Sequence, residues 1–529
     1  MKLKSKVTTN KMVKLFATAS IVSSIAFTSA IPLANATSAN VPGKSPVKPF
    51  ILEEATIEDM QKALQTGKIT STQLVQMYID RINHLDKGKI NSVLEINPDA
   101  LEIAEELDKN RKGKGNVGPL YGIPVIVKDN IDTADKMHTS AGSLALKDNI
   151  AAEDSFVAER LREEGAIILG KANMTEWANF MSYNMPSGYS SRGGQVLNPY
   201  GKEFAVGGSS AGTGASVASN FAAVGIGTET SGSILSPSVN NSLVGIKPTV
   251  GLVSRSGIIP LAHSQDTAGP MARTVADAAA LLGTITGVDE KDPITKESTG
   301  KVPEDYTKFL KKNGLKGERV GIDTRYLKNV PAQEAEIIQE ALEDMEEQGA
   351  TIVDTATIPS KDELANFSSS VLAYEFKGDI NAYLGKLPDN IPVHSLAELI
   401  QYNSDNADTM LKYGQQRQID SQALSGNLTD STYLEHRAKD LRLSREEGID
   451  YALEAYDLDA IIFPNTTGAA IAAKAGYPSV TVPAGYTTAG KPVGVTFTST
   501  AYSEPKLIEL AYSYEQATEH RVSPVLDIK

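Results

Sequence analysis

Residues 207–235, GGSSAGTGASVASNFAAVGIGTETSGSIL, form a distinctive stretch that consists mostly of Gly, Ser, Ala and Thr. Small residues at this density let a helix lie close to a sheet, and this structural interpretation stands beside three functional ones. As a phosphate loop the stretch has Gly207 and Gly212 at the required spacing, but Thr213 stands where a lysine is needed. As a dinucleotide-binding turn it lacks the third glycine.

A nucleophile elbow is the third functional interpretation. Gly208-Ser-Ser210-Ala-Gly212 matches the G-x-S-x-G pattern, a helix-prone stretch follows it, and His520 near the C-terminus would be the base. An esterase of the α/β-hydrolase type would use Ser210 and His520 in this way. Residues 201–206, GKEFAV, make a poor buried strand, whereas an elbow requires a strand before its serine.

Short apolar runs and helical patterns alternate on both sides of this stretch. The apolar runs predict buried strands at residues 122–127, 166–169, 319–322, 351–353 and 459–463. Helices are predicted at 99–111, 154–164 and 331–349, and capping boxes open two more at Thr56 with Asp59 and at Thr70 with Gln73. This alternation predicts an α/β fold with a mostly parallel or mixed sheet. Residues 360–450 are more polar, and we expect them to form helices that cover the sheet.

The first 36 residues differ from everything after them. Five lysines precede an apolar stretch from Leu15 to about Leu33, and Ala34-Asn35-Ala36 closes it. This order predicts a secretory signal peptide at residues 1–36, with an uncleaved membrane anchor as the alternative. Residues 37–52 are rich in Pro, Ser and Lys and predict a linker. We therefore expect a secreted protein, or one associated with the cell envelope, that has no stable membrane anchor after cleavage. The pattern suits a bacterial exporter, of the Gram-positive kind.

Composition and charge exclude several classes of function. The chain has 529 residues, of which 41% are apolar and 22% charged, an ordinary globular balance. Its formal charge of −14 repels phosphate backbones, so we expect no nucleic-acid partner. The absence of cysteine excludes disulfides, cysteine nucleophiles and thiolate metal sites. The six histidines are scattered and form no H-E-x-x-H, so neither a catalytic zinc nor another cofactor is expected.

Several motifs, in order along the chain, resemble those of the amidase-signature family. The segments Gly207–Gly212 and Gly227–Ile234 resemble the family's signature, and residues 122–130, GIPVIVKDN, resemble its lysine strand. Residues 244–252, 265–273 and 475–485 are also similar. The residues of these motifs are most similar to those of bacterial peptide-amidase-like or general amidase members. The resemblance implies one large α/β catalytic domain, residues 53–525, with a mixed sheet of about eleven strands wrapped by helices.

The resemblance also implies a triad for hydrolysis of a carboxylic amide. Ser233 is the nucleophile, Ser209 is a bridging serine on a cis peptide bond, and Lys128 is the base. A serine hydroxyl is a poor nucleophile near neutral pH and needs an adjacent base, and burial favours the neutral amine of a lysine. The proton passes from Ser233 to Ser209 to Lys128, and an acyl-enzyme forms. The substrate is a small-molecule or peptide amide, and the products are an acid and ammonia or an amine.

The family's oxyanion hole is made of backbone N–H groups, which carry over to Thr230, Ser231, Gly232 and Ser233. By position, Phe180 is expected at the entrance of the substrate pocket. The chain departs from the family at Glu229, Ser231 and Leu235, where Asp, Gly and Arg are usual. The side chain of Ser231 and the cation missing at Leu235 are expected to alter the preference for substrate charge. A catalytically inactive, secreted binding protein of the same fold is the remaining alternative.

Overall fold

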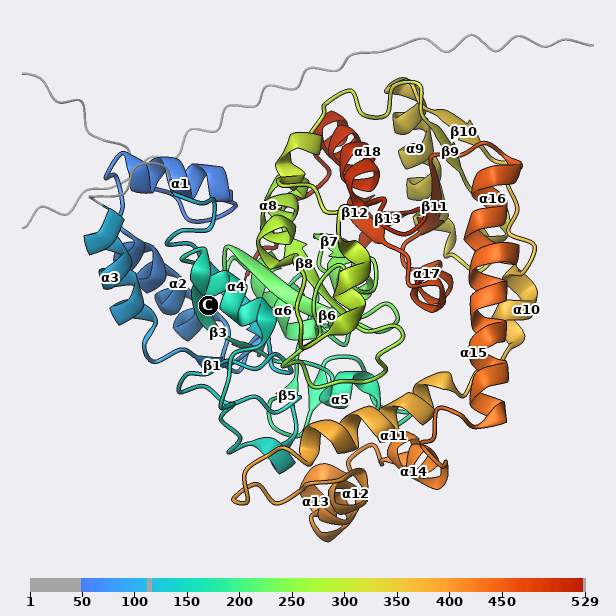
Figure 1. Cartoon of the computed structure of the whole chain (residues 1–529). Helices are drawn as coiled ribbons and strands as arrows, with labels where there is room; N and C mark the ends of the chain where they lie inside the picture. The colour runs from blue at the N-terminus through green and yellow to red at the C-terminus, as the bar shows by residue number, and fades with distance from the viewer. Residues whose placement is uncertain (1–48, 112–116, 527–529) are drawn as a thin grey trace, which may run out of the picture. The chain divides into compact units, whose positions relative to one another are not determined.

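Eleven strands form one mixed sheet in the computed structural model, which describes residues 49–111 and 117–526 (Figure 1). Their order is β1-β3-β2-β6-β8-β7-β12-β13-β11-β9-β10, and β4 and β5 form a separate two-stranded sheet. β2 pairs in parallel with β3 and β6, and the series from β6 to β11 is antiparallel. The strands are β1 Val93–Ile96, β2 Pro124–Lys128, β3 Ile167–Ala172, β4 Tyr189–Ser190, β5 Gly194–Gln195, β6 Val224–Glu229, β7 Val244–Lys247, β8 Thr267–Ala272, β9 Arg319–Gly321, β10 Thr351–Val353, β11 Ala460–Pro464, β12 Ser479–Tyr486 and β13 Pro492–Thr498.

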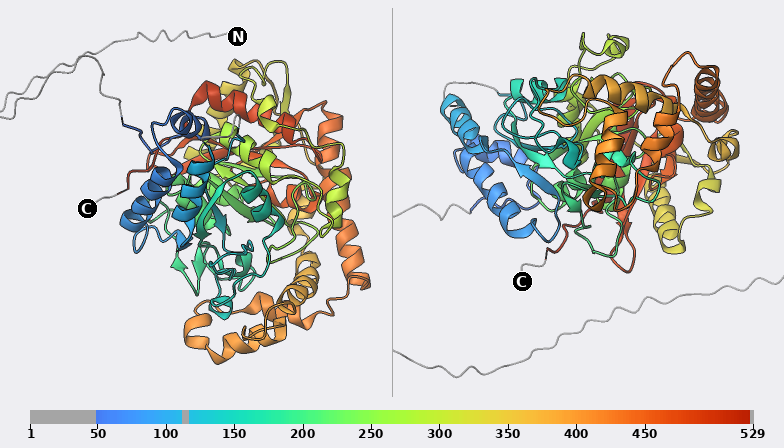
Figure 2. Two further views of the ribbon diagram at one scale, coloured as in Figure 1. Left: turned by 60° about the vertical axis from the view of Figure 1, so that its left-hand side comes forward. Right: turned by 90° about the horizontal axis from the view of Figure 1, so that it is seen from below.

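Two groups of helices pack against this sheet (Figures 1 and 2). Helices α6 and α7 contact each other and the central strands, whereas α4, α8, α18 and α9 form a second series of contacting helices. The α-helices are α1 Ile57–Gln65, α2 Ser71–Leu85, α3 Ala100–Arg111, α4 Phe156–Glu163, α5 Glu176–Asn179, α6 Ala211–Ala218, α7 Leu235–Asn240, α8 Val275–Ile285, α9 Ala332–Glu347, α10 Lys361–Asn366, α11 Val371–Leu384, α12 Leu396–Asp405, α13 Ala407–Met410, α14 Gln416–Ala423, α15 Ser431–Ser444, α16 Asp450–Ala455, α17 Ala469–Ala475 and α18 Glu504–Thr518. The shorter turns are the 3₁₀ helices Leu144–Leu146, Pro293–Ser298, Tyr306–Phe309 and Thr324–Leu327 and a π-helical turn at Arg445–Ile449.

The predicted α/β fold with a mixed sheet of about eleven strands is confirmed. All five apolar runs that predicted strands form strands, and both predicted capping boxes are present. From Phe50 onward the chain forms one compact unit. The predicted signal peptide at 1–36 and most of the predicted linker at 37–52 lie outside the described residues. Within the described ranges no helix is long and apolar enough to cross a membrane.

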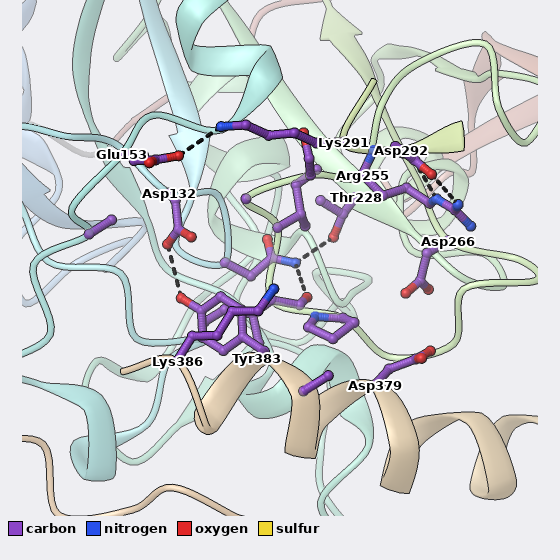
Figure 3. A pocket seen from close by; sticks show the side chains of 18 of the residues that line it. Asp132, Glu153, Thr228, Arg255, Asp266, Lys291, Asp292, Asp379, Tyr383 and Lys386 are labelled. Atoms are coloured by element: carbon purple, nitrogen blue, oxygen red, sulfur yellow. Dashed lines mark hydrogen bonds and ion pairs between the residues drawn. The ribbon is translucent and has the colours of Figure 1, made fainter. Parts of the chain in front are cut away.

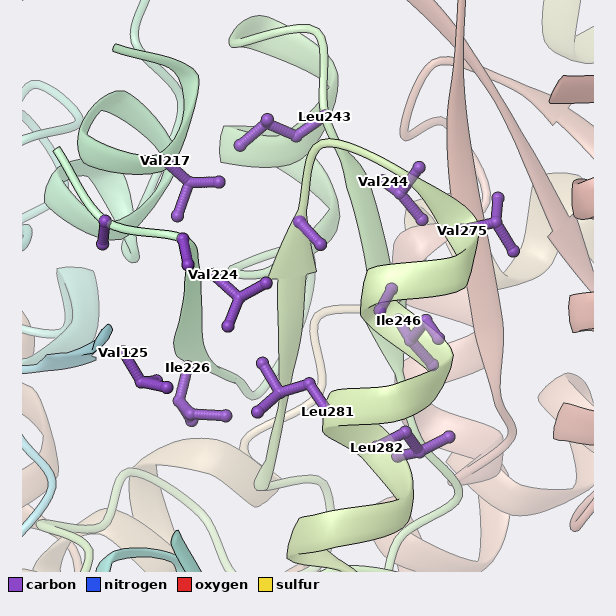
Figure 4. Close-up of a cluster of buried hydrophobic side chains, with 14 of the residues drawn as sticks. Val125, Val217, Val224, Ile226, Leu243, Val244, Ile246, Val275, Leu281 and Leu282 are labelled. Carbon is purple, nitrogen blue, oxygen red and sulfur yellow. The ribbon is translucent and has the colours of Figure 1, made fainter. Parts of the chain in front are cut away.

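The small residues of the 207–235 stretch allow α6 to pack tightly beside the sheet. A Cβ atom on Gly212 would lie 2.2 Å from the carbonyl oxygen of Asn173 and 2.4 Å from that of Ser92, so only glycine fits there. The strand that follows, β6, is buried along its whole length. Figure 4 shows aliphatic side chains of β6, α6 and α8 that pack together around the central strands. The structural interpretation of this stretch, close packing of a helix on the sheet, is therefore correct.

The expectation that residues 360–450 cover the sheet is wrong for helices α11 to α14. The buried side chains of α11, α12 and α13 form a second core with residues 141–146, 174–185 and 259–262, which are loops and short helices outside the main sheet, and α14 packs against α11 and α12. In Figure 1 these helices lie below the sheet, beside α5. The spacing of their apolar residues predicted correctly that one face of these helices is buried. Periodicity does not identify the element against which that face packs. As a result, α11 to α14 cover the loops at one end of the sheet instead of one of its faces.

Candidate active site

The carboxyl ends of the parallel strands β2 and β6 bring the predicted catalytic segments together. Lys128 is the last residue of β2, and the segment 230–233 follows directly after β6. The peptide bond between Gly208 and Ser209 is cis, as the resemblance implies. The segment 230–233, which carries the predicted nucleophile, is called the nucleophile segment here. The N–H of Ser210 donates to the carbonyl of Ser233 at 3.2 Å and so joins this segment to the turn that carries Ser209.

Lys128 contacts Ser209 directly. The side chain is completely buried, and its Nζ lies 2.8 Å from Oγ of Ser209. The remaining two contacts of Nζ are with Thr228, at 2.8 Å to Oγ1 and 3.1 Å to the carbonyl oxygen. Burial lowers the pKa of Lys128 to about 7, and the negative charges of Asp266 and Glu229 partly oppose this shift. The amine is therefore neutral in a large part of the population at neutral pH, which a base requires.

Ser233 lies on a segment that is linked to this pair through the backbone. It is 8% exposed, and no hydrogen bond joins its hydroxyl to Ser209 within the part of the chain that the structure describes. The two serines are connected through the backbone bond from Ser210. Of the three predicted catalytic residues, the structure thus places Lys128 and Ser209 in contact and Ser233 on the adjoining segment.

Glu229 holds the nucleophile segment in its conformation. Its buried carboxylate accepts three backbone hydrogen bonds, from Gly232 and Ile234 at 2.7 Å and from Leu235 at 3.0 Å. The N–H of Gly232 is therefore occupied, and the expectation that it is a free donor of the oxyanion hole needs correction. For the N–H groups of Thr230, Ser231 and Ser233, no hydrogen bond is found among the described residues. These three groups are the donors that remain available.

A cavity of about 810 Å³ opens beside this segment (Figure 3). Thr228 and Thr230 line its inner part, together with Asn130, whose Nδ2 donates to Oγ1 of Thr228 at 3.0 Å. The wall contains ion pairs and hydrogen-bonded acids, among them Asp132, which accepts a 3.0 Å hydrogen bond from the hydroxyl of Tyr383 on α11. The cavity therefore reaches the residues that surround Lys128 and is closed on one side by α11.

Phe180 supports the wall of this region. Its side chain is 5% exposed, and its ring packs against that of Phe376 on α11 with centroids 4.8 Å apart. In this segment Ala178, not Phe180, is the residue that lines the cavity. The backbone of residues 177–179 has positive φ angles although none of them is glycine. Such strained backbone costs about 1–3 kcal/mol per residue and clusters at functional sites.

The rival pair Ser210 and His520 is not assembled. The hydroxyl of Ser210 donates to the carbonyl of Thr228 at 3.1 Å and accepts its N–H at 3.2 Å. The ring of His520 lies 3.5 Å from Asp344 of α9, and no interaction joins it to Ser210 in the described chain. The geometry therefore gives no support to the α/β-hydrolase type of site.

One cluster of side chains could hold a cation. The ligand atoms of His263, Glu375 and Asp379 lie within 4.8 Å of one another. These side chains also bind one another, because Nδ1 of His263 lies 2.8 Å from the carboxylate of Asp379. This hydrogen bond raises the pKa of the imidazole. The arrangement is that of an ion pair between α11 and the loop of residues 255–266, which lines the cavity and is called the cavity loop here.

Sequence reasoning missed Thr228 and Asp266 and the role of Glu229. Thr228 and Asp266 belong to or border motifs that resemble the family, but no spacing rule connects them to Lys128 or Thr230. The signal that could have found them is the pairing of β6 with β8, in which Glu229 lies opposite Thr267. Residues 230 and 266 are then the next opposed pair, which places Asp266 beside the nucleophile segment.

Comparisons with known proteins agree with the fold. The profile of the family described as Amidase matches residues 73–508. A protein of Arabidopsis thaliana named as an amidase is 42% identical over 485 residues, which are 90% of this chain and 92% of the plant protein. The crystal structure of the native peptide amidase from Stenotrophomonas maltophilia has a TM-score of 0.85 and 44% identity, covering 90% of this chain and 100% of that one. For an amidase family protein from Bacillus anthracis the TM-score is 0.84 and the identity 41%, over 90% of this chain and 93% of that one.

Proposed function

Because this chain belongs to the amidase family and is an enzyme that hydrolyses amide C–N bonds, we propose that Lys128, Ser209 and Ser233 carry out the reaction. The observation that carries the proposal is the 2.8 Å contact between Nζ of Lys128 and Oγ of Ser209 in a fully buried site. An amine whose pKa is lowered to about 7 accepts a proton at neutral pH and returns it later in the cycle.

The proton route follows from the number of donors on a neutral amine. Two N–H groups of Lys128 donate to Thr228, one to its carbonyl and one to Oγ1, and the lone pair then faces the hydroxyl of Ser209. Ser209 gives its proton to Lys128 and receives one from Ser233, whose oxygen attacks the amide carbonyl. Lys128 then returns its proton to Ser209, Ser209 gives one proton to the departing nitrogen, and water releases the acyl group from Ser233.

The negative oxygen of the tetrahedral intermediate needs donors that are already in place. We assign this role to the N–H groups of Thr230, Ser231 and Ser233, with Glu229 holding the segment from behind. In other hydrolases the loss of one such donor costs about 3–4 kcal/mol of transition-state stabilisation. The side chain of Ser231, which is exposed, lies at this point of the segment.

The substrate that the comparisons favour is a peptide amide. The structural relative from Stenotrophomonas maltophilia is a peptide amidase, and its whole chain is covered at 44% identity. A cavity of about 810 Å³ is in the range that accommodates a ligand of peptide size. Together with the signal-peptide pattern of residues 1–36, this supports a secreted enzyme that deamidates peptides outside the cell.

Ammonia release from C-terminally amidated dipeptides, compared with short aliphatic amides, tests this function. Ser233→Ala, Ser209→Ala and Lys128→Met are expected to reduce kcat by several orders of magnitude, because each removes one member of the proton route. His520→Ala, whose ring lies beside Asp344, is the matched control and should retain most of the activity, and Ser210→Ala, whose hydroxyl bonds to the backbone of Thr228, should retain more activity than Ser233→Ala. Full hydrolysis by Lys128→Met together with an inactive His520→Ala would contradict the assignment.

A further inference from the structure

The carboxylate of Asp266 connects two parts of the proposed machinery. Its Oδ1 accepts a 2.5 Å hydrogen bond from Oγ1 of Thr230, the first residue of the nucleophile segment. Its Oδ2 accepts the N–H groups of Leu261 and Ala262, both at 2.8 Å. The carboxylate therefore fixes the start of the 230–233 segment to a turn of the neighbouring loop, and it lines the cavity beside Thr230.

Asp266 also contributes charge at the position of the base. Among the charged groups that act on Lys128, Asp266 has the largest effect and Glu229 the second, and both favour the ammonium form. The charged groups that face Asp266 itself are Asp379 from α11 and Arg255 from the cavity loop. Burial raises the pKa of Asp266 to about 6, so the group is mostly an anion at neutral pH.

We propose that Asp266 is a positioning residue of the hydrolysis reaction, which orients the nucleophile segment through Thr230 and supplies a negative charge that acts on Lys128. The proposal rests on the proposed function because it takes Lys128 as the base. Asp266 does not need to touch the reacting atoms: one oxygen acts through a hydroxyl and the charge acts through space. The two effects can be separated by substitution.

Asp266→Asn isolates the charge. The amide oxygen can still accept from Leu261 and Ala262 while the NH₂ group donates to Oγ1 of Thr230, so the hydrogen bonds survive with one direction reversed. Without the anion the pKa of Lys128 falls, and the acid limb of the kcat/KM profile should move to lower pH by about half a unit. Glu153→Gln, at the exposed rim of the same cavity, removes a like charge without touching the segment and should leave the limb unchanged.

Thr230→Val isolates the orientation. It removes the hydroxyl and keeps the side-chain shape and the backbone N–H, so kcat should fall roughly tenfold with little change in KM and no shift of the acid limb. Thr230→Ser restores the hydroxyl and should recover most of kcat. A purely structural role of Asp266 would lower the stability of Asp266→Asn without moving its pH profile.

Each outcome decides the proposal. An acid limb of Asp266→Asn that coincides with that of the wild type overturns the electrostatic part, and wild-type kcat in Thr230→Val overturns the orienting part. If Asp266→Asn does not fold, as judged by circular dichroism, Asp266→Glu takes its place: it keeps the charge, so kcat should fall while the limb stays, and a shifted limb would overturn the proposal. Failure of the proposed function itself is recognised separately, because Lys128→Met would then remain active.

Discussion

Glu229→Gln is the perturbation whose effect follows most closely from the geometry. The carboxylate accepts three backbone N–H groups at 2.7, 2.7 and 3.0 Å. Glutamine has the same shape, and its single oxygen can serve Ile234 and Leu235, which share one oxygen of the native carboxylate. Its NH₂ group then faces the N–H of Gly232, donor against donor, and that hydrogen bond is lost.

The loss in the free energy of unfolding follows from these three hydrogen bonds. A hydrogen bond to a charged group contributes about 1.5–3 kcal/mol, and the two surviving bonds become neutral and weaker. We therefore expect the free energy of unfolding to fall by about 3 kcal/mol. Since Gly232 directly precedes Ser233, the loosened segment should also lower kcat by roughly one to two orders of magnitude.

Urea denaturation followed by circular dichroism, together with steady-state ammonia release, measures both effects. Glu229→Asp is the matched control: it keeps the charge, is one methylene shorter, and should lose less stability than Glu229→Gln. An unchanged free energy of unfolding and an unchanged kcat in Glu229→Gln would refute the view that this carboxylate holds the nucleophile segment.

The other predictions concern the base, the packing of α6 and a helix cap. With Lys128 at a pKa of about 7, kcat/KM should fall tenfold per pH unit below that value, because the protonated amine cannot accept a proton; a limb near pH 4 would instead indicate a carboxylate base. Gly212→Ala places a Cβ 2.2 Å from a backbone oxygen and should lower the free energy of unfolding by at least about 1–3 kcal/mol, and a melting temperature equal to that of the wild type would contradict this. Thr70→Ala removes the acceptor for the N–H of Gln73 and should cost about 1 kcal/mol in urea denaturation with kcat unchanged, whereas a loss of activity would mean that α2 affects the site.

The pattern of residues predicts some strands and not others for a physical reason. β2, PVIVK, and β11, AIIFP, contain runs of Val and Ile, and such runs are typical of strands buried on both faces. β6, VGIGTE, and β8, TAGPMA, are equally buried but contain Gly, Thr and Pro, because α6 and the opposite strand approach them too closely for large side chains. The β-strand propensity of these two segments is therefore weak, and tertiary packing is what makes them strands.

The residues of the site also fall into some that the sequence predicts and some that it does not. Lys128, Ser209 and Ser233 could be proposed from motifs whose order resembles a family, and the structure places the first two in contact. Thr228, Glu229 and Asp266 act through the register of neighbouring strands and through backbone N–H groups, which no residue spacing encodes. Gly232 is the instructive case: the resemblance implies its N–H as a donor of the oxyanion hole, and in the structure this N–H donates to the carboxylate of Glu229.

Trapping the acyl-enzyme tests the central claim most directly. A fluorophosphonate that reacts with serine nucleophiles is added to the wild type and to Ser233→Ala, and the labelled peptide is identified by mass spectrometry. We predict a single adduct on Ser233, absent from Ser233→Ala and strongly slowed in Lys128→Met. An adduct on Ser210, or labelling of Ser233→Ala at the wild-type rate, would contradict the account.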